Sequence, residues 1–147
     1  MGTMIPGGQI LECSNFGNIS GEGTQVGGIL GVLATINSVS NDKVEMCINF
    51  GNLKAPSVVG GILGLGGTEG DYVKYCYNKG EVTGSSFVGS IMGKQMADVG
   101  TFEHLYYLST LNYKAINNVN YDEKNITSTT KNINSFGEFK TWIAKFN

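Results

Sequence analysis

A short hydrophobic segment with regularly placed glycines recurs along the chain. It spans residues 26–31 and 59–64 as Val-Gly-Gly-Ile-Leu-Gly, and residues 88–93 in the looser form Val-Gly-Ser-Ile-Met-Gly. Apolar residues that alternate with glycine over so short a run are typical of a β-strand rather than a helix. Because the copies lie about 30 residues apart, the chain is predicted to consist of stacked copies of one structural unit.

A polar motif precedes each of these segments at a nearly constant distance. It consists of a cysteine, an asparagine two residues later, a glycine after two more, and a hydrophobic residue after a further two. The copies are Cys13/Asn15/Gly17/Ile19, Cys47/Asn49/Gly51/Leu53 and Cys76/Asn78/Gly80/Val82. A degenerate fourth copy follows at residues 102–107, with Leu105 in the cysteine position. Constant spacing within the unit and variable connectors between units are typical of stacked repeats.

The residue three positions before each cysteine position is also hydrophobic. These residues are Ile10, Val44, Val73 and Phe102. Side chains of a strand alternate between its two faces, so two inward residues at an odd spacing predict a bend or a β-bulge between them. The residue directly before the cysteine position is then expected to face outward.

Together the repeats predict an all-β fold, a short right-handed parallel β-helix (β-solenoid) of three to four coils. The handedness follows the rule for parallel crossover connections. We expect residues 1–9 to form a junction and a leading strand, and the coils to cover about 10–38, 39–66, 67–97 and 98–113. Such a stack exposes strand edges at its ends, and its early start in the sequence indicates a parent protein that continues upstream.

The last segment, residues 114–147, combines a polar stretch with an amphipathic pattern. Ser135 and Glu138 have the spacing of a capping box at a helix N-terminus. The apolar residues that follow share one helical face, namely Phe136, Phe139, Trp142, Ile143 and Phe146. A capping α-helix is therefore predicted from about Phe136 to Lys145, packed on the last coil and covering its edge.

Composition and charge argue against several classes of function. The chain has 147 residues, a net charge of −2 and 10 basic residues, all of them lysine. Nucleic-acid-binding proteins usually present a basic face that includes arginine. No apolar run is long enough to cross a bilayer, and the N-terminus has no recognisable signal peptide. We therefore expect no nucleic-acid partner and no membrane insertion of this chain.

The motifs resemble the GLUG-motif repeats of bacterial cell-surface proteins, whose hallmark is Cys-x-Asn-x-Gly-x-hydrophobic followed by Val-Gly-Gly-Ile-x-Gly. The resemblance covers roughly residues 10–107. It implies a secreted or cell-surface location and a parent chain such as a large adhesin or a protein with an immunoglobulin A metalloprotease domain. It also implies no catalytic residues, and partners that are neighbouring domains or repeats, or a host glycan or protein.

The candidate structural residues of the repeat are Cys13, Cys47, Cys76, Asn15, Asn49 and Asn78. The thiols are expected to project in parallel as a buried ladder of free cysteines, with a disulfide or a metal site as the alternatives. The asparagine amides are expected to form a hydrogen-bonded ladder along the stack, with contact to a ligand as the alternative.

Several acidic residues precede successive coils. Asp42, Asp71 and Asp98 are interpreted as solvated turn residues, with a column of calcium ligands as the alternative. The single histidine, His104, is expected on the surface, because it shares the outward position of Glu12, Met46 and Tyr75. No cysteine or serine lies beside it in register as a nucleophile.

Tyrosines gather in the third and fourth copies of the repeat. Tyr75, Tyr77 and Tyr106 are the candidate ligand-facing residues, since outward aromatic side chains on a flat sheet can stack on sugars or peptides. The favoured interpretation, however, is that these tyrosines support loops and the C-terminal helix.

The predicted function is a non-catalytic structural or adhesive module that needs no cofactor and no metal. A carbohydrate- or protein-binding module that uses an outward tyrosine face is the alternative. A polysaccharide-degrading β-helix enzyme fits less well, because it needs acidic residues paired across a groove and the acids of this chain are scattered.

Overall fold

The computed structural model describes residues 7–33, 41–67, 69–96, 100–110, 114–117 and 125–146. This part of the chain consists of parallel β-sheets with a short helix near the C-terminus. The all-β class predicted from the repeats is therefore confirmed.

The largest sheet in the described part of the chain has seven strands. They are β1 (Gln9–Leu11), β2 (Ser14–Asn15), β6 (Lys43–Glu45), β7 (Ile48–Asn49), β11 (Tyr72–Asn78), β15 (Thr101–Leu108) and β16 (Ile126–Thr129). The other sheets there have three strands each: β3 (Ile19–Ser20), β8 (Leu53–Lys54) and β12 (Val82–Thr83); β4 (Gln25–Gly27), β9 (Val58–Gly60) and β13 (Val88–Gly89); β5 (Leu30–Val32), β10 (Leu63–Gly66) and β14 (Met92–Gln95).

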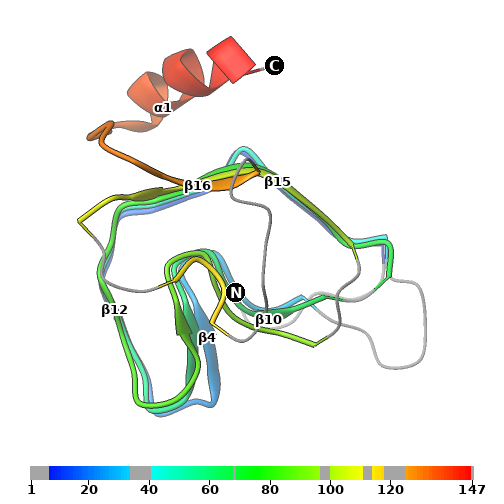
Figure 1. Cartoon of the computed structure of the whole chain (residues 1–147), viewed down its shortest axis with the longest axis vertical. Helices are drawn as coiled ribbons and strands as arrows, with labels where there is room; N and C mark the ends of the chain where they lie inside the picture. The colour runs from blue at the N-terminus through cyan, green and yellow to red at the C-terminus, as the bar shows by residue number, and fades with distance from the viewer. Residues whose placement is uncertain are drawn as a thin grey trace.

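Strands pair in parallel with their equivalents in the neighbouring repeat. Val44 lies between Ile10 and Val73 in the first sheet, and Cys76 pairs with Leu105. Leu53 and Val59 pair with equivalent residues of both neighbouring repeats in the other sheets. Seen along the stacking direction, successive repeats superpose (Figure 1). Each layer of the stack is thus one copy of the sequence repeat.

The bend expected from the odd spacing lies at the residue before the cysteine position. Glu12, Met46, Tyr75 and His104 have φ angles of 53°, 58°, 52° and 51°. Left-handed backbone costs a non-glycine residue roughly 1–2 kcal/mol, so four stacked examples mark a fixed feature of the repeat. The turn restores the inward direction of the next side chain, which explains the odd spacing between the two hydrophobic positions.

The described residues form two hydrophobic clusters inside the stack. One lies beneath the first sheet and includes Val44, Cys47, Ile62 and Val73 among its fully buried members. The other consists of Leu53, Ala55, Val59, Val82 and Val88, with Ile19 and Val26 at its margin. The second cluster fills the space between the strands labelled β4 and β12 in Figure 1.

The stack continues beyond the fourth copy, into a stretch that the sequence led us to expect as polar and irregular. Strand β16 pairs in parallel with β15 and places Ile126, which is 3% exposed, next to Leu105. Ile116 makes an isolated parallel bridge to Met92. A few hydrophobic residues in register are therefore enough to add a partial layer without the repeat motif.

Helix α1 (Phe136–Ile143) begins at the predicted cap and is followed by the 3₁₀ turn η1 (Ala144–Phe146). The Ser135 hydroxyl accepts a hydrogen bond from the backbone N–H of Glu138 at 3.1 Å. The Glu138 carboxylate accepts one from the backbone N–H of Asn134 at 2.8 Å. The first bond satisfies an N–H group that a helix start leaves without an internal partner, and the second ties the residue before the cap to the first turn.

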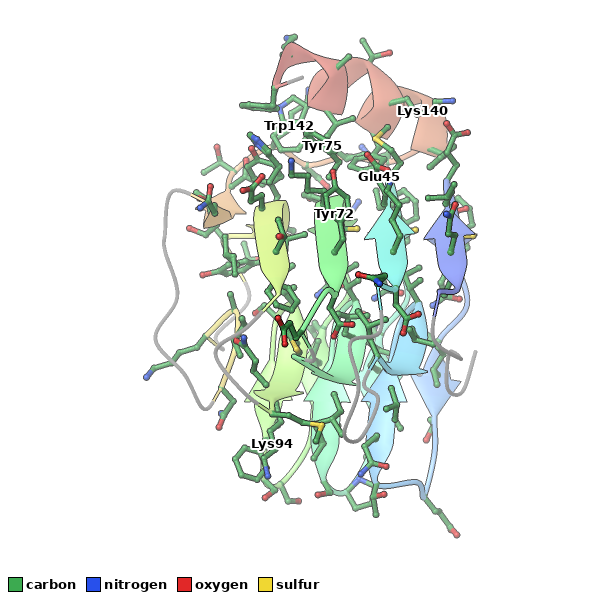
Figure 2. The ribbon with its side chains drawn as sticks, turned by 90° about the vertical axis from the view of Figure 1, so that its right-hand side faces the viewer. Glu45, Tyr72, Tyr75, Lys94, Lys140 and Trp142 are labelled. Carbon is green, nitrogen blue, oxygen red and sulfur yellow. The ribbon has the colours of Figure 1, made fainter. Side chains whose placement is uncertain are left out.

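The position of α1 differs from the expectation. The helix does not cover the end of the stack but lies across the outer face of the first sheet (Figure 2). Phe139 and Ile143, both fully buried, pack with Ile48, Tyr77 and Tyr106 from three successive repeats. Those outward side chains form the apolar surface that the amphipathic helix needs, whereas β16 covers the edge of β15.

Candidate functional site

A column of asparagines runs through the stack in the described repeats. The Asn15 amide donates to Oδ1 of Asn49 at 2.8 Å, and the Asn49 amide donates to Oδ1 of Asn78 at 2.8 Å. The Asn78 amide donates to the backbone carbonyl of Ser90, also at 2.8 Å. All three asparagines thus take part in the expected hydrogen-bonded ladder.

Each asparagine also bonds to the glycine two residues later. The Asn49 amide donates to the carbonyl oxygen of Gly51 at 2.8 Å, and its Oδ1 accepts from the Gly51 N–H at 3.3 Å. Asn49 thereby uses both amide hydrogens and both acceptor positions of its side chain. This arrangement allows Asn49 and Asn78 to be 0% exposed without unpaired polar groups.

The glycines of this motif are needed for the close stacking of layers. A Cβ on Gly51 would overlap the carbonyl oxygen of Gly17, and a Cβ on Gly80 would overlap that of Gly51. Gly28 and Gly61, in the second motif, face the side chains of Asn49 and Asn78 with no room for a Cβ. Both glycine motifs therefore serve the packing of the asparagine column.

The cysteines form a second column, in which all three thiols are free. Each thiol donates to the carbonyl oxygen two residues earlier, at 3.4 Å for Cys13, 3.3 Å for Cys47 and 3.3 Å for Cys76. Cys47 and Cys76 are buried, and burial raises the pKa of the Cys76 thiol well above its usual value. The expectation of burial is wrong for Cys13, which is exposed because no described repeat lies on its outer side.

The aspartates are not solvated turn residues as the sequence led us to expect. Asp42 and Asp71 are 0% and 1% exposed. Asp42 Oδ1 accepts from the Gly8 N–H at 3.0 Å, and Asp71 Oδ2 accepts from the Gly67 N–H at 3.3 Å. Both carboxylates thus bind backbone N–H groups of residues that lie outside the strands, Gly8 just before β1 and Gly67 just after β10. Asp98 lies outside the described residues.

Two of the candidate ligand-facing tyrosines are covered by α1. Tyr77 is 0% exposed and donates its hydroxyl to the carbonyl oxygen of Lys131 at 2.8 Å, while Tyr106 is 8% exposed. Burial raises the pKa of Tyr77 to about 12. The alternation of side chains correctly places both outside the sheet, and their contacts with α1 agree with the interpretation that these tyrosines support the C-terminal helix.

Tyr75 remains partly accessible and lies in the row of left-handed residues. Its ring stacks on His104 with centroids 4.9 Å apart, and the His104 ring contacts Phe146 at 6.4 Å. Both side chains are half-buried rather than fully exposed. Contacts with the C-terminal segment explain the partial burial of His104, which the sequence places simply on the surface.

The outer surface beside the helix carries a set of alternating charges around Tyr72. The Lys43 and Lys74 ammonium groups lie 5.1 and 5.2 Å from the centre of the Tyr72 ring. Lys43 pairs with Glu45 at 3.0 Å, and Lys74 pairs with Glu103 at 2.8 Å. We call these five residues the Tyr72 patch; Figure 2 shows Tyr72 and Glu45 on this face, below the helix.

The Tyr72 patch was not singled out from the sequence. Its residues carry no motif, and the sequence signal for them is their outward register on three neighbouring strands. The hydrogen bond that the Lys74 ammonium donates to the Glu103 carboxylate is the main cause that raises the pKa of Lys74 to about 12. The patch is a polar surface around a half-buried aromatic ring, and such rings can contact a sugar or a peptide.

The described residues contain no cluster of three or more metal-binding side chains and no helix of the length and hydrophobicity that a membrane span requires. Comparison with family models, curated proteins and solved structures finds no match to the chain.

Proposed function

We propose that the chain is a non-catalytic structural or adhesive repeat module of a bacterial secreted or cell-surface protein. In this proposal its fold is a short right-handed parallel β-helix, and its motifs are those of the GLUG-like repeats that they resemble. Its partners are neighbouring repeats or domains of a longer parent chain.

The observation that carries the proposal is the use of the repeated polar residues inside the stack. Asn49 directs all four hydrogen-bonding positions of its side chain to the stack, and Asn78 bonds to the same kinds of partner. The residues that recur therefore hold layers together, while outward positions such as Gln9, Lys43 and Tyr72 differ between layers. This division supports a scaffold whose outer surface determines what it contacts.

A second candidate function is binding of a carbohydrate or peptide by the Tyr72 patch. The two flanking lysines, each paired with a glutamate, favour it because they offer donors and acceptors around an aromatic ring. In this candidate the binding surface is the Tyr72 patch and not the surface of Tyr77 and Tyr106, because the helix covers the latter.

The test is an adhesion assay on immobilised host matrix proteins and glycans, combined with incubation of the protein with polysaccharides. We expect no release of new reducing ends, and retention on at least one surface. Binding through the Tyr72 patch would be lost in Tyr72→Ala but kept in Thr141→Ala, an exposed helix position as control. Turnover of a polysaccharide would contradict the non-catalytic proposal.

A further inference from the structure

The first repeat has the same strand edge as the later repeats, but in the described structure nothing lies against it. Cys13 is exposed, whereas its equivalents Cys47 and Cys76 are 0% exposed. Phe16 is 62% exposed and stacks one face on Phe50, with ring centroids 4.6 Å apart. Leu11 on the same layer is 45% exposed. This edge is therefore both apolar and rich in backbone groups that a strand can pair with.

Among the described residues, the asparagine column ends at this edge with one acceptor position of the Asn15 side chain unused. Asn15 Oδ1 accepts from the Gly17 N–H at 3.2 Å, whereas Asn49 Oδ1 accepts from Gly51 and also from the amide of Asn15. The direction of the column places an amide donor of a preceding layer next to Asn15 Oδ1. The geometry thus defines which group an occupant would present.

The space around Gly17 gives a second and independent indication that a further layer can pack on this edge. A Cβ on Gly51 or Gly80 would overlap the carbonyl oxygen of the glycine in the preceding layer. A Cβ on Gly17 would meet only the Asn15 side-chain oxygen, at 3.8 Å, which is ordinary contact. The contacts of the described residues therefore do not require glycine at position 17. A preceding layer would require it, because its glycine carbonyl would lie against this position.

We propose that the open edge of the first repeat is a docking surface for one further repeat of the same pattern, carried in tandem with the first. Its asparagine amide would donate to Asn15 Oδ1, its glycine carbonyl would lie against Gly17, and its side chains would cover Cys13 and Phe16. The docked repeat continues the interface that already joins each layer to the next. This inference rests on the proposed function as a repeat module and names its partner.

A second copy of this chain fits the edge less well. Its opposite end presents Tyr107, and then Ser128, in the asparagine column. Neither residue is followed two positions later by a glycine. The carbonyl that Gly17 is shaped to receive is therefore missing from that end.

The experiment is a tandem variant in which residues 7–40 are duplicated ahead of Gly7, with Cys13→Ser in the added copy. The reaction of the original Cys13 with a maleimide is measured in the native state. A docked repeat buries this thiol, so we expect labelling about tenfold or more slower than in the parent chain. Labelling at the parent rate overturns the proposal.

The matched control is Gly17→Ala in the original copy. In the parent chain it should leave the melting temperature and the labelling rate of Cys13 unchanged. In the tandem variant it should restore fast labelling and make the added copy sensitive to protease, which shows that protection depends on the Gly17 contact. Slow labelling that persists in the tandem Gly17→Ala variant overturns the proposed contact.

Concentration-dependent protection of Cys13 in the unduplicated chain would assign the edge to self-association and overturn the tandem proposal. Trp142 fluorescence of each variant reports whether the rest of the chain is folded. Failure of docking would leave the adhesion assay unaffected, so the two proposals fail separately.

Discussion

The side-chain amide of Asn78 occupies the space that a Cβ on Gly61 would need. In the next layer Ser90 takes the position of Gly61, and there Tyr107 replaces asparagine in the column. A side chain at this position thus occurs where the facing asparagine is absent. The presence of serine instead of glycine in the third copy of the segment is therefore consistent with Tyr107 in the facing position.

We predict that Gly61→Ser destabilises the chain by about 2 kcal/mol, because the added atoms press on the packed amide of Asn78 and on the backbone carbonyl of Ser90. The cost should be smaller than additive in combination with Asn78→Ala, which removes the amide contact and leaves only the contact with the Ser90 carbonyl. Urea unfolding followed by circular dichroism measures both values. Gly23→Ser is the control, since a Cβ there meets nothing within 4 Å. Strict additivity of the two changes would contradict the coupling.

Asn49→Leu should cost about 3 kcal/mol, because it leaves several buried hydrogen-bonding groups without partners. Asn15→Leu should cost clearly less, since Asn15 is only half-buried and lacks a described neighbour on one side. The comparison of the two free energies of unfolding tests the column. Equal losses at both positions would mean that burial of the amide is not what matters.

Because the Tyr77 hydroxyl is buried, we predict that the protein loses stability in alkaline solution. Burial raises its pKa from 10.0 to about 12, so the unfolded chain releases this proton before the folded chain does. The contribution of the neutral phenol is present below pH 10 and is lost as pH rises toward 12. The stability difference between wild type and Tyr77→Phe should therefore shrink over this range. A constant difference in urea titrations at successive pH values would argue against a buried phenol.

The three cysteines should differ in their rate of reaction with a thiol reagent according to the layer in which they lie. In the native protein, Ellman's reagent should react rapidly with Cys13 and slowly with Cys47 and Cys76, whereas all three should react in urea. Cys13→Ser should abolish the fast phase. A fast phase that survives this substitution would mean that the inner layers open readily.

The docking of α1 depends on Phe139, a residue of the helix that is 0% exposed and packs against the first sheet. Phe139→Ala should cost about 3 kcal/mol and release the helix from the sheet. The single tryptophan, Trp142, packs edge-on against Tyr106 with ring centroids 4.8 Å apart, so its emission should shift to the red. Thr141→Ala, at an exposed position of the same helix, should change neither stability nor emission.

Repeated positions account for most of what could be predicted from the sequence. The spacing of Cys47, Asn49 and Gly51 predicted the register of the layers, because each residue must meet its equivalent for the layers to stack. The odd spacing between Val73 and Cys76 predicted a bend, which lies at the left-handed Tyr75. Periodicity is informative here because the same physical constraint acts in every layer.

Features that occur once could not be read in the same way. The pattern of Phe139 and Ile143 predicts an apolar helix face, but it does not tell which surface that face covers. Strand β16 has four residues and no motif, so its pairing depends on the neighbouring edge of β15. The burial of Asp42 likewise involves a distant residue, Gly8, whose backbone N–H binds its carboxylate. Each of these outcomes follows from tertiary contacts rather than from local pattern.

Helix α1 also changes how the layers respond to separation. Lys140 reaches Glu12 of the first layer at 3.4 Å, and the apolar face contacts Ile48, Tyr77 and Tyr106 of the next three. In a stack where each unit contacts only its neighbours, end units can detach one at a time. Because α1 contacts four layers, the loss of any one of these layers also weakens the attachment of the helix. Under a pulling force the layers should therefore yield together in a single cooperative event, and the mechanical strength of the module should depend on an element outside the repeats.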